Sequence, residues 1–141
     1  MIVIDASVAL AWTFPDESTD FACGVRDRVL REGALVPAVW TLEVANAIVQ
    51  AERKGRIDAA AATAALALFQ DLPVTIIPGA LSEDFNLVAA LARDHPDHGM
   101  TASDAAYLSL ARKEGVALAT LDEPLARCAR KLGIAVLAVE V

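Results

Sequence analysis

The sequence predicts an α/β protein built on one open parallel sheet with helices on both faces. The first observation is the run Ile2-Val3-Ile4, which lacks polar alternation and is typical of a strand covered on both faces. The second is that short β-branched runs alternate with longer helical patterns along the chain, which favours right-handed crossovers between parallel strands. The third is size, because 141 residues that are 56% apolar suffice for one core. We therefore expect a single domain over residues 1–141.

The first half of the chain contains two predicted strands and four predicted helices. The strands are 2–4 and 34–37, and the helices run from about 6 to 12, 17 to 31, 41 to 54 and 58 to 70. Thr41 is the expected N-cap of the third helix. On that helix Leu42 and Val44 fall on the expected core side, whereas Glu43 lies on the opposite stripe. The alanine-rich arm 58–70 should return as the second half of a helical hairpin.

The second half contains three more predicted strands. Val74, Ile76 and Ile77 indicate a strand within 72–77, followed by a helix over 82–93 with Ser82 as its cap. The remaining helices are expected over 102–113 and 123–131, and the remaining strands over 116–120 and 134–137.

Charge and composition restrict the function. A net charge of −7 argues against blanket electrostatic binding of nucleic acid, but it does not exclude a nuclease whose acidic pocket binds cations. Cys23 and Cys128 stand far apart and read as packing residues in a reducing compartment. No run approaches the roughly 18 apolar residues of a membrane span, and no basic segment precedes the first apolar run. We expect a cytoplasmic protein without membrane contact.

Four acidic residues are the candidate catalytic and metal-binding residues: Asp5, Glu43, Asp104 and Asp122. Each has a local explanation as a helix cap or a first-turn acid. However, Asp5 and Asp122 follow strands, and Glu43 and Asp104 begin returning helices, so all four belong to one edge of a parallel sheet. Two unit charges about 4 Å apart repel by roughly 4 kcal/mol at an effective dielectric of 20, which a bound cation would offset.

The residue types indicate which cation this edge would hold. Carboxylates without nearby His or Cys suit Mg²⁺ or Mn²⁺, and phosphoryl transfer through a metal-activated water is the chemistry most often built on such a site. Ser7, Asn46 and Thr120 each lie within three residues of one of the acids and are expected to support them. His95 and His98 share one Pro/Gly loop and read as surface residues.

Four runs in this chain match a known family: Ile4-Asp5-Ala6-Ser7-Val8, Leu42-Glu43-Val44-Ala45-Asn46-Ala47, Ser103-Asp104-Ala105-Ala106-Tyr107-Leu108-Ser109-Leu110-Ala111 and Leu118-Ala119-Thr120-Leu121-Asp122. The chain resembles the PIN-domain ribonucleases of the VapC type, the toxins of toxin-antitoxin pairs. The resemblance implies a three-layer α/β/α fold with a five-stranded parallel sheet. It also implies Mg²⁺- or Mn²⁺-dependent cleavage of RNA, a homodimer, and inhibition by a small antitoxin protein.

The resemblance assigns metal-ligand roles most directly to Asp5 and Asp104, with Glu43 and Asp122 completing the site. The alternative is a catalytically idle PIN-like module that only binds a partner protein. A phosphoacceptor receiver domain is disfavoured because no Asp ends the third strand, and a dinucleotide-binding enzyme because no Gly-x-Gly-x-x-Gly follows the first. The hairpin 41–70 is the expected groove for an antitoxin helix.

Overall fold

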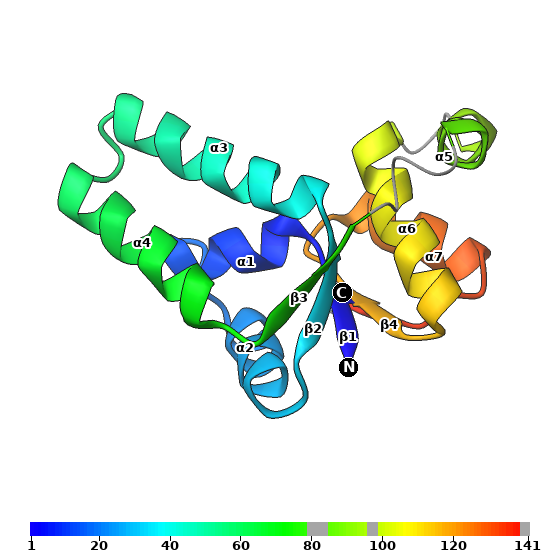
Figure 1. Cartoon of the computed structure of the whole chain (residues 1–141), viewed down its shortest axis with the longest axis horizontal. Coiled ribbons are helices and arrows are strands. Elements are labelled where there is room, and N and C mark those ends of the chain that lie inside the picture. The colour runs from blue at the N-terminus through cyan, green and yellow to red at the C-terminus, as the bar shows by residue number, and fades with distance from the viewer. Residues whose placement is uncertain (79–84, 96–98, 139–141) are drawn as a thin grey trace.

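The computed structural model describes residues 1–78, 85–95 and 99–138 (Figure 1). Along the chain the elements are β1 (Ile2–Ile4), α1 (Ala6–Thr13), α2 (Asp20–Glu32), β2 (Ala34–Pro37), α3 (Val39–Arg53), α4 (Ala59–Asp71), β3 (Val74–Ile77), α5 (Phe85–Asp94), α6 (Ala102–Glu114), β4 (Ala117–Ala119), α7 (Glu123–Lys131) and β5 (Val136–Leu137).

The sheet has five parallel strands in the order β3-β2-β1-β4-β5. β1 is the central strand, and its Ile2 pairs with Ala34 of β2 on one side and with Ala117 of β4 on the other. The chain first builds outward to β3 and then crosses back to β4, so the strand order reverses beside β1. Such a reversal is where open parallel sheets place ligands, beyond the carboxyl ends of the strands.

The helices form two layers that enclose the sheet (Figure 1). α1, α2, α3 and α4 pack against one another on one side, and α5, α6 and α7 lie on the other, where α6 contacts β1, β2 and β4. The predicted three-layer α/β/α architecture is confirmed.

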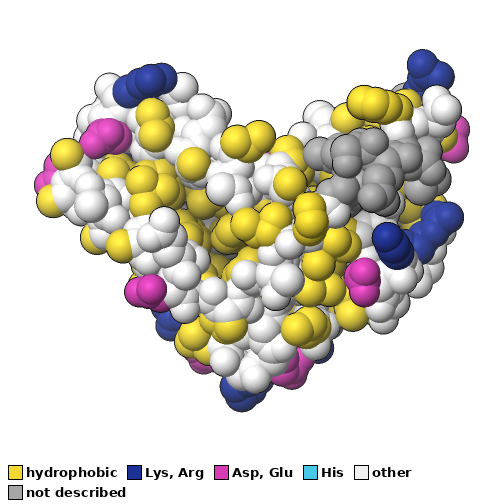
Figure 2. Space-filling model, in the orientation of Figure 1, with side chains coloured by type: hydrophobic (Ala, Val, Ile, Leu, Met, Phe, Trp, Pro, Cys, Tyr) yellow, Lys and Arg dark blue, Asp and Glu magenta, His cyan; other side chains and the backbone are white. Residues whose placement is uncertain are grey.

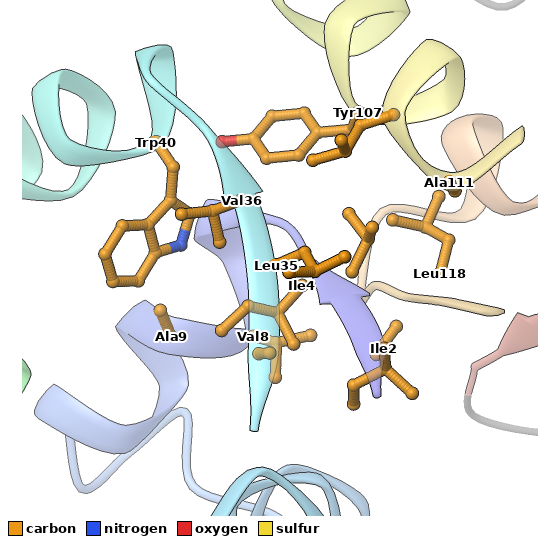
Figure 3. Packing of buried hydrophobic residues seen from close by; sticks show 14 of the residues in the cluster. Ile2, Ile4, Val8, Ala9, Leu35, Val36, Trp40, Tyr107, Ala111 and Leu118 are labelled. Carbon is orange, nitrogen blue, oxygen red and sulfur yellow. The ribbon is translucent and has the colours of Figure 1, made fainter. Parts of the chain in front are cut away.

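The core is centred on β1, whose three residues are all fully buried. Figure 3 shows Ile2 and Ile4 among Leu35 and Val36 of β2 and Leu118 of β4. Burying apolar surface is worth about 25 cal/mol per Å², so a strand with both faces covered contributes strongly to stability. The unalternating apolar run that predicted this strand therefore reflects its central position.

Two helix starts differ from the prediction. α2 begins at Asp20, capped by the Thr19 hydroxyl, which accepts the backbone N–H of Ala22 at 3.1 Å. α3 begins at Val39 after Ala38, whose side chain makes no capping bond, so the prediction of Thr41 as the N-cap was wrong. The buried Trp40 explains the early start, since anchoring its indole in the core holds the preceding residues in the helix.

The predicted core side of α3 was also partly wrong, because Leu42 is 71% exposed. The buried stripe is instead Trp40, Val44, Ile48 and Ala51, which recur at helical spacing. Once Trp40 belongs to that stripe, Leu42 lies two residues and about 200° around the helix from it.

Two expectations fall outside the described residues, namely the cap role of Ser82 and the placement of His98. Within residues 1–78, 85–95 and 99–138, no helix combines the length and the apolar character needed to cross a membrane.

Candidate active site

Asp5 stands at the carboxyl end of the central strand and is 5% exposed. Its Oδ1 accepts the Ser7 hydroxyl at 2.6 Å and the Val8 backbone N–H at 3.3 Å, which also caps α1. Its Oδ2 accepts the Thr120 hydroxyl at 2.6 Å. Both carboxylate oxygens are therefore held by donors, so Asp5 is at once a helix cap and a fixed acid at the sheet edge.

The two hydroxyls that hold Asp5 are themselves oriented by backbone groups. Ser7 Oγ accepts the Leu121 N–H at 3.0 Å, and Thr120 Oγ1 accepts the Asp122 N–H at 2.9 Å. A hydroxyl has a single hydrogen, and here each one points to the Asp5 carboxylate. The ends of β1 and β4 are thereby tied together, and the structure places both Ser7 and Thr120 where the sequence predicted supporting groups.

Burial decides the protonation of Asp5. It raises the pKa of this carboxyl from 3.8 to about 6, despite the opposing effect of the hydrogen bonds from Ser7, Thr120 and Val8. The negative charge of Asp122 raises the pKa further. Asp5 is therefore ionised at neutral pH but takes up a proton in mildly acidic solution.

Asp122 is the N-cap of α7, where its Oδ1 accepts the Leu125 N–H at 3.1 Å. It is half-buried, and its charge acts on Asp5. Asp122 therefore lies at the same end of the sheet as Asp5, as predicted from the two strand ends.

Asp104 forms a capping box with Thr101 at the start of α6. Its Oδ2 accepts the Thr101 N–H at 3.1 Å, while its own N–H donates to Thr101 Oγ1 at 3.1 Å. The side chain is half-buried. The cap therefore fixes the Asp104 carboxylate at the first turn of α6.

Glu43 is half-buried in the first turns of α3, and its Oε1 accepts the Tyr107 hydroxyl at 2.5 Å. Tyr107 lies on α6, one turn after Asp104, and is 1% exposed. Burial, the bond to Glu43 and the charges of Glu43, Asp5 and Asp104 all raise the pKa of this phenol. The negative charges of three of the four predicted acids therefore act on the Tyr107 hydroxyl.

Tyr107 was not singled out from the sequence as a site residue. A tyrosine within an apolar helix reads as core packing, and its partner Glu43 is remote in sequence. The usable signal was its spacing from Asp104, because residues three apart share a helix face.

The four acids are not gathered tightly. Among the described residues, no three His, Cys, Asp or Glu side chains lie close enough together to hold a metal ion. Asn46 is exposed and makes no side-chain hydrogen bond to the part of the chain that the structure describes. The metal-ligand roles of the four acids and the supporting role of Asn46 therefore stay predictions.

A second feature is an apolar groove of about 450 Å³ between the α3–α4 hairpin and the edge strand β3. It is lined by ten uncharged residues: Trp40, Thr41, Val44, Ala45, Leu66, Phe69, Gln70, Leu72, Val74 and Ile76. Figure 2 shows hydrophobic side chains gathered over this hollowed face. The groove lies beside the acidic edge, because α3 carries both Glu43 and part of its lining.

A three-layer α/β/α fold with acids at the carboxyl ends of its parallel strands defines a class of proteins that bind ligands at that edge of the sheet. The PIN domain family model matches residues 2–131, so the chain belongs to the PIN-domain family. It is 31% identical over 126 residues to Ribonuclease VapC3 of Mycobacterium tuberculosis, covering 89% of this chain and 85% of that protein.

Solved structures show the same fold. The structure of PAE2754 from Pyrobaculum aerophilum matches with a TM-score of 0.66 and 22% identity, covering 96% of this chain and 88% of that one. The structure of VapBC2 from Rickettsia felis bound to a DNA fragment from their promoter matches with a TM-score of 0.68 and 12% identity, covering 99% and 100% of the two chains.

Proposed function

We propose that this protein is an endoribonuclease and the toxin of a type II toxin-antitoxin system, hydrolysing RNA phosphodiester bonds with Mg²⁺ or Mn²⁺. The observation that carries the proposal is the buried Asp5 carboxylate, held by two oriented hydroxyls beside Asp122. An acid kept at such a cost of burial is expected at a functional site. Membership of the PIN-domain family and the likeness to a named ribonuclease support the assignment.

The donor set fits a hard divalent cation. Asp5, Glu43, Asp104 and Asp122 supply only carboxylate oxygens, which Mg²⁺ and Mn²⁺ prefer. When bound, such a cation polarises the scissile phosphate and lowers the pKa of the attacking water. The charges of Glu43, Asp5 and Asp104 all act on the Tyr107 hydroxyl, which supports a common location of these acids at one edge of the sheet.

The chain's own residues prepare this site before any cation binds. Ser7 and Thr120 hold Asp5 in one orientation, and Asp5 is ionised above about pH 6, the form that a cation requires. Asp104 is fixed by the capping box and Asp122 by its N-cap bond. Three of the four acids are therefore positioned by hydrogen bonds from groups that lie close to them in sequence.

The first prediction concerns the RNA ends that cleavage leaves. Ribonucleases that use the RNA's 2′-hydroxyl need a general base and acid, commonly histidines, on the two sides of the phosphate. The only histidines, His95 and His98, are close neighbours in the sequence. We expect attack by water, which leaves a 5′-phosphate and a 3′-hydroxyl, and we expect cleavage to survive a 2′-deoxy substitution at the scissile nucleotide.

End-labelled RNA incubated with purified protein, with Mn²⁺ or with chelator, tests this expectation. Formation of 2′,3′-cyclic phosphate ends in chelator would contradict it. A protein that binds its partner but cleaves no RNA under any metal condition would instead be the catalytically idle PIN-like module.

The partner that we assign to the groove is an amphipathic antitoxin helix that packs its apolar face into it. In α4 only Ala62 is buried, while Leu66 and Leu68 are 39% and 52% exposed, and Ile76 of the edge strand is 47% exposed. A strand of a parallel sheet is normally covered on both faces, so β3 lacks part of its cover. An amphipathic helix supplies matching apolar residues, and an uncharged lining is suited to it.

The same proposal includes a homodimer and a cytoplasmic location, which both rest on the family resemblance. Light scattering on the purified toxin, with and without antitoxin, measures the oligomeric state directly.

A further inference from the structure

The Tyr107 hydroxyl joins the two helical layers above the end of the sheet. Tyr107 belongs to α6 and Glu43 to α3, on opposite faces of the sheet, and the oxygens of the two groups lie 2.5 Å apart. Figure 3 shows the Tyr107 ring extending from α6 toward the junction of β2 and α3, with its hydroxyl at the leading end. No other tyrosine exists in the chain.

Packing fixes the ring that carries this hydroxyl. Tyr107 is among the largest fully buried side chains and contributes to the main core, so its position is set by close contacts on all sides. Glu43 is different, because it is half-buried and has a long, flexible side chain. In this pair the tyrosine is the rigid member and the glutamate is the member that needs to be held.

The conformational freedom of Glu43 works against its staying in place. A half-buried glutamate on a helix surface has several rotamers open to it, including ones that point into solvent. Tyr107 is the one hydrogen-bond donor to the Glu43 side chain among the described residues. Its hydroxyl is therefore the group that selects the observed Glu43 rotamer.

We propose that Tyr107 is a positioning residue for the reaction, whose hydroxyl holds the Glu43 carboxylate at the acidic edge, where Glu43 would help to bind a divalent cation. This inference rests on the proposed metal-dependent ribonuclease function. Tyr107 contacts neither cation nor RNA in this role and acts through Glu43 alone.

A double-mutant cycle tests the proposal with full-length wild type, Tyr107→Phe, Glu43→Gln and the double variant. Mn²⁺ binding is measured by the loss of the free-ion paramagnetic resonance signal, and stability is measured separately in chelator. We expect Tyr107→Phe to weaken Mn²⁺ binding about tenfold, the lower end for groups that orient metal ligands. In the Glu43→Gln background the same change should have no further effect, because the residue through which Tyr107 acts is gone.

Cleavage of RNA provides the second readout. Excess Mn²⁺ should restore kcat of Tyr107→Phe toward wild type, since the ion can order Glu43 by itself, but it should not restore Glu43→Gln. Val29→Ala is the matched control, because Val29 is fully buried in α2 and its truncation lowers stability away from the acidic edge. That variant should bind Mn²⁺ as wild type does.

The outcomes separate the two ideas. A Tyr107→Phe variant that melts lower but binds Mn²⁺ with wild-type affinity would show a purely structural tie and overturn the positioning role, leaving the ribonuclease proposal intact. The positioning role would also be overturned if the two substitutions weakened Mn²⁺ binding independently. In that case the double variant would show the product of the two single effects of Tyr107→Phe and Glu43→Gln. A wild type that neither binds Mn²⁺ nor cleaves RNA would overturn the proposed function and this role together.

Discussion

At the scale of single residues, Asp5 shows two opposing physical effects. Its carboxylate receives three hydrogen bonds, which favour the ionised form, yet burial outweighs them and the pKa rises to about 6. The shift from 3.8 corresponds to about 3 kcal/mol at 1.36 kcal/mol per unit. That cost is present at neutral pH whenever no cation compensates it.

The second prediction concerns the pH dependence of stability that the raised pKa of Asp5 causes. Between about pH 4 and pH 6 the folded Asp5 binds a proton that the unfolded chain does not, so its contribution to stability falls as pH rises through this window. Asp5→Asn removes the titration. In chelator, the free energy of unfolding of the variant minus that of wild type should rise by up to about 3 kcal/mol from pH 4 to pH 7.

Urea unfolding at a series of pH values measures this difference. Asp122→Asn is the comparison, because Asp122 is half-buried and acts on Asp5 only through its charge. A difference between Asp5→Asn and wild type that stays constant with pH would contradict the burial argument.

The hydrogen bonds of Ser7 and Thr120 to Asp5 could be anticipated from the sequence, whereas their supporting role at a cation site stays a prediction. Ser7 lies two residues after Asp5, and Thr120 directly follows β4, the strand that pairs with β1, so the topology alone brings both hydroxyls to Asp5. The role of Tyr107 was not predicted, because the hydrogen bond from its hydroxyl to Glu43 depends on how two helices from opposite layers approach each other. No local pattern encodes that approach.

At the scale of elements, periodicity located the strands and most helices but missed the start of α3. Trp40 packs edge-on against Phe69 of α4, with ring centroids 5.9 Å apart, and that tertiary contact places Trp40 in the buried stripe. The stripe then leaves Leu42 exposed, contrary to the helical projection from Thr41. A helix boundary that is set by a contact with another helix is beyond local sequence rules.

The third prediction concerns the exposed face of the α3–α4 hairpin. Leu66→Glu puts a charge into the apolar groove at a position that is already 39% exposed, so folding should be little affected. Affinity for the antitoxin partner should fall by about 2 kcal/mol or more, roughly 30-fold, as for truncation of a central interface residue. Calorimetric titration of antitoxin into toxin measures the change.

Leu30→Glu is the matched control, since Leu30 is 55% exposed on α2 and does not line the groove. It should bind antitoxin with wild-type affinity. If Leu66→Glu also binds with wild-type affinity, the antitoxin helix lies on another surface.

At the scale of the whole molecule, the proposed cation site draws on both helical layers and on the sheet between them. Glu43 comes from α3 in one layer and Asp104 from α6 in the other, while Asp5 and Asp122 follow β1 and β4. The alternation of strands and helices was enough to predict that these four lie at one edge. Their separations could not be predicted, because small shifts of α3 and α6 across the sheet change them without altering the topology.

The last prediction is that a cation stabilises this assembly as a unit and that Asp104 is part of its binding site. At a free concentration about 100-fold above Kd, Mn²⁺ adds about 2.7 kcal/mol, or roughly 8 °C in Tm for a domain of this size. Asp104→Asn should weaken binding about tenfold and reduce the rise to roughly half. In chelator the variant should melt no lower than wild type, because relief of repulsion offsets the lost helix-dipole interaction and the amide oxygen still accepts the Thr101 N–H.

Glu114→Gln makes the same charge change at the exposed opposite end of α6 and should keep the full Mn²⁺ response. Scanning calorimetry of the three proteins with Mn²⁺ and with chelator decides the point. Equal Mn²⁺ shifts for Asp104→Asn and wild type would remove Asp104 from the cation site.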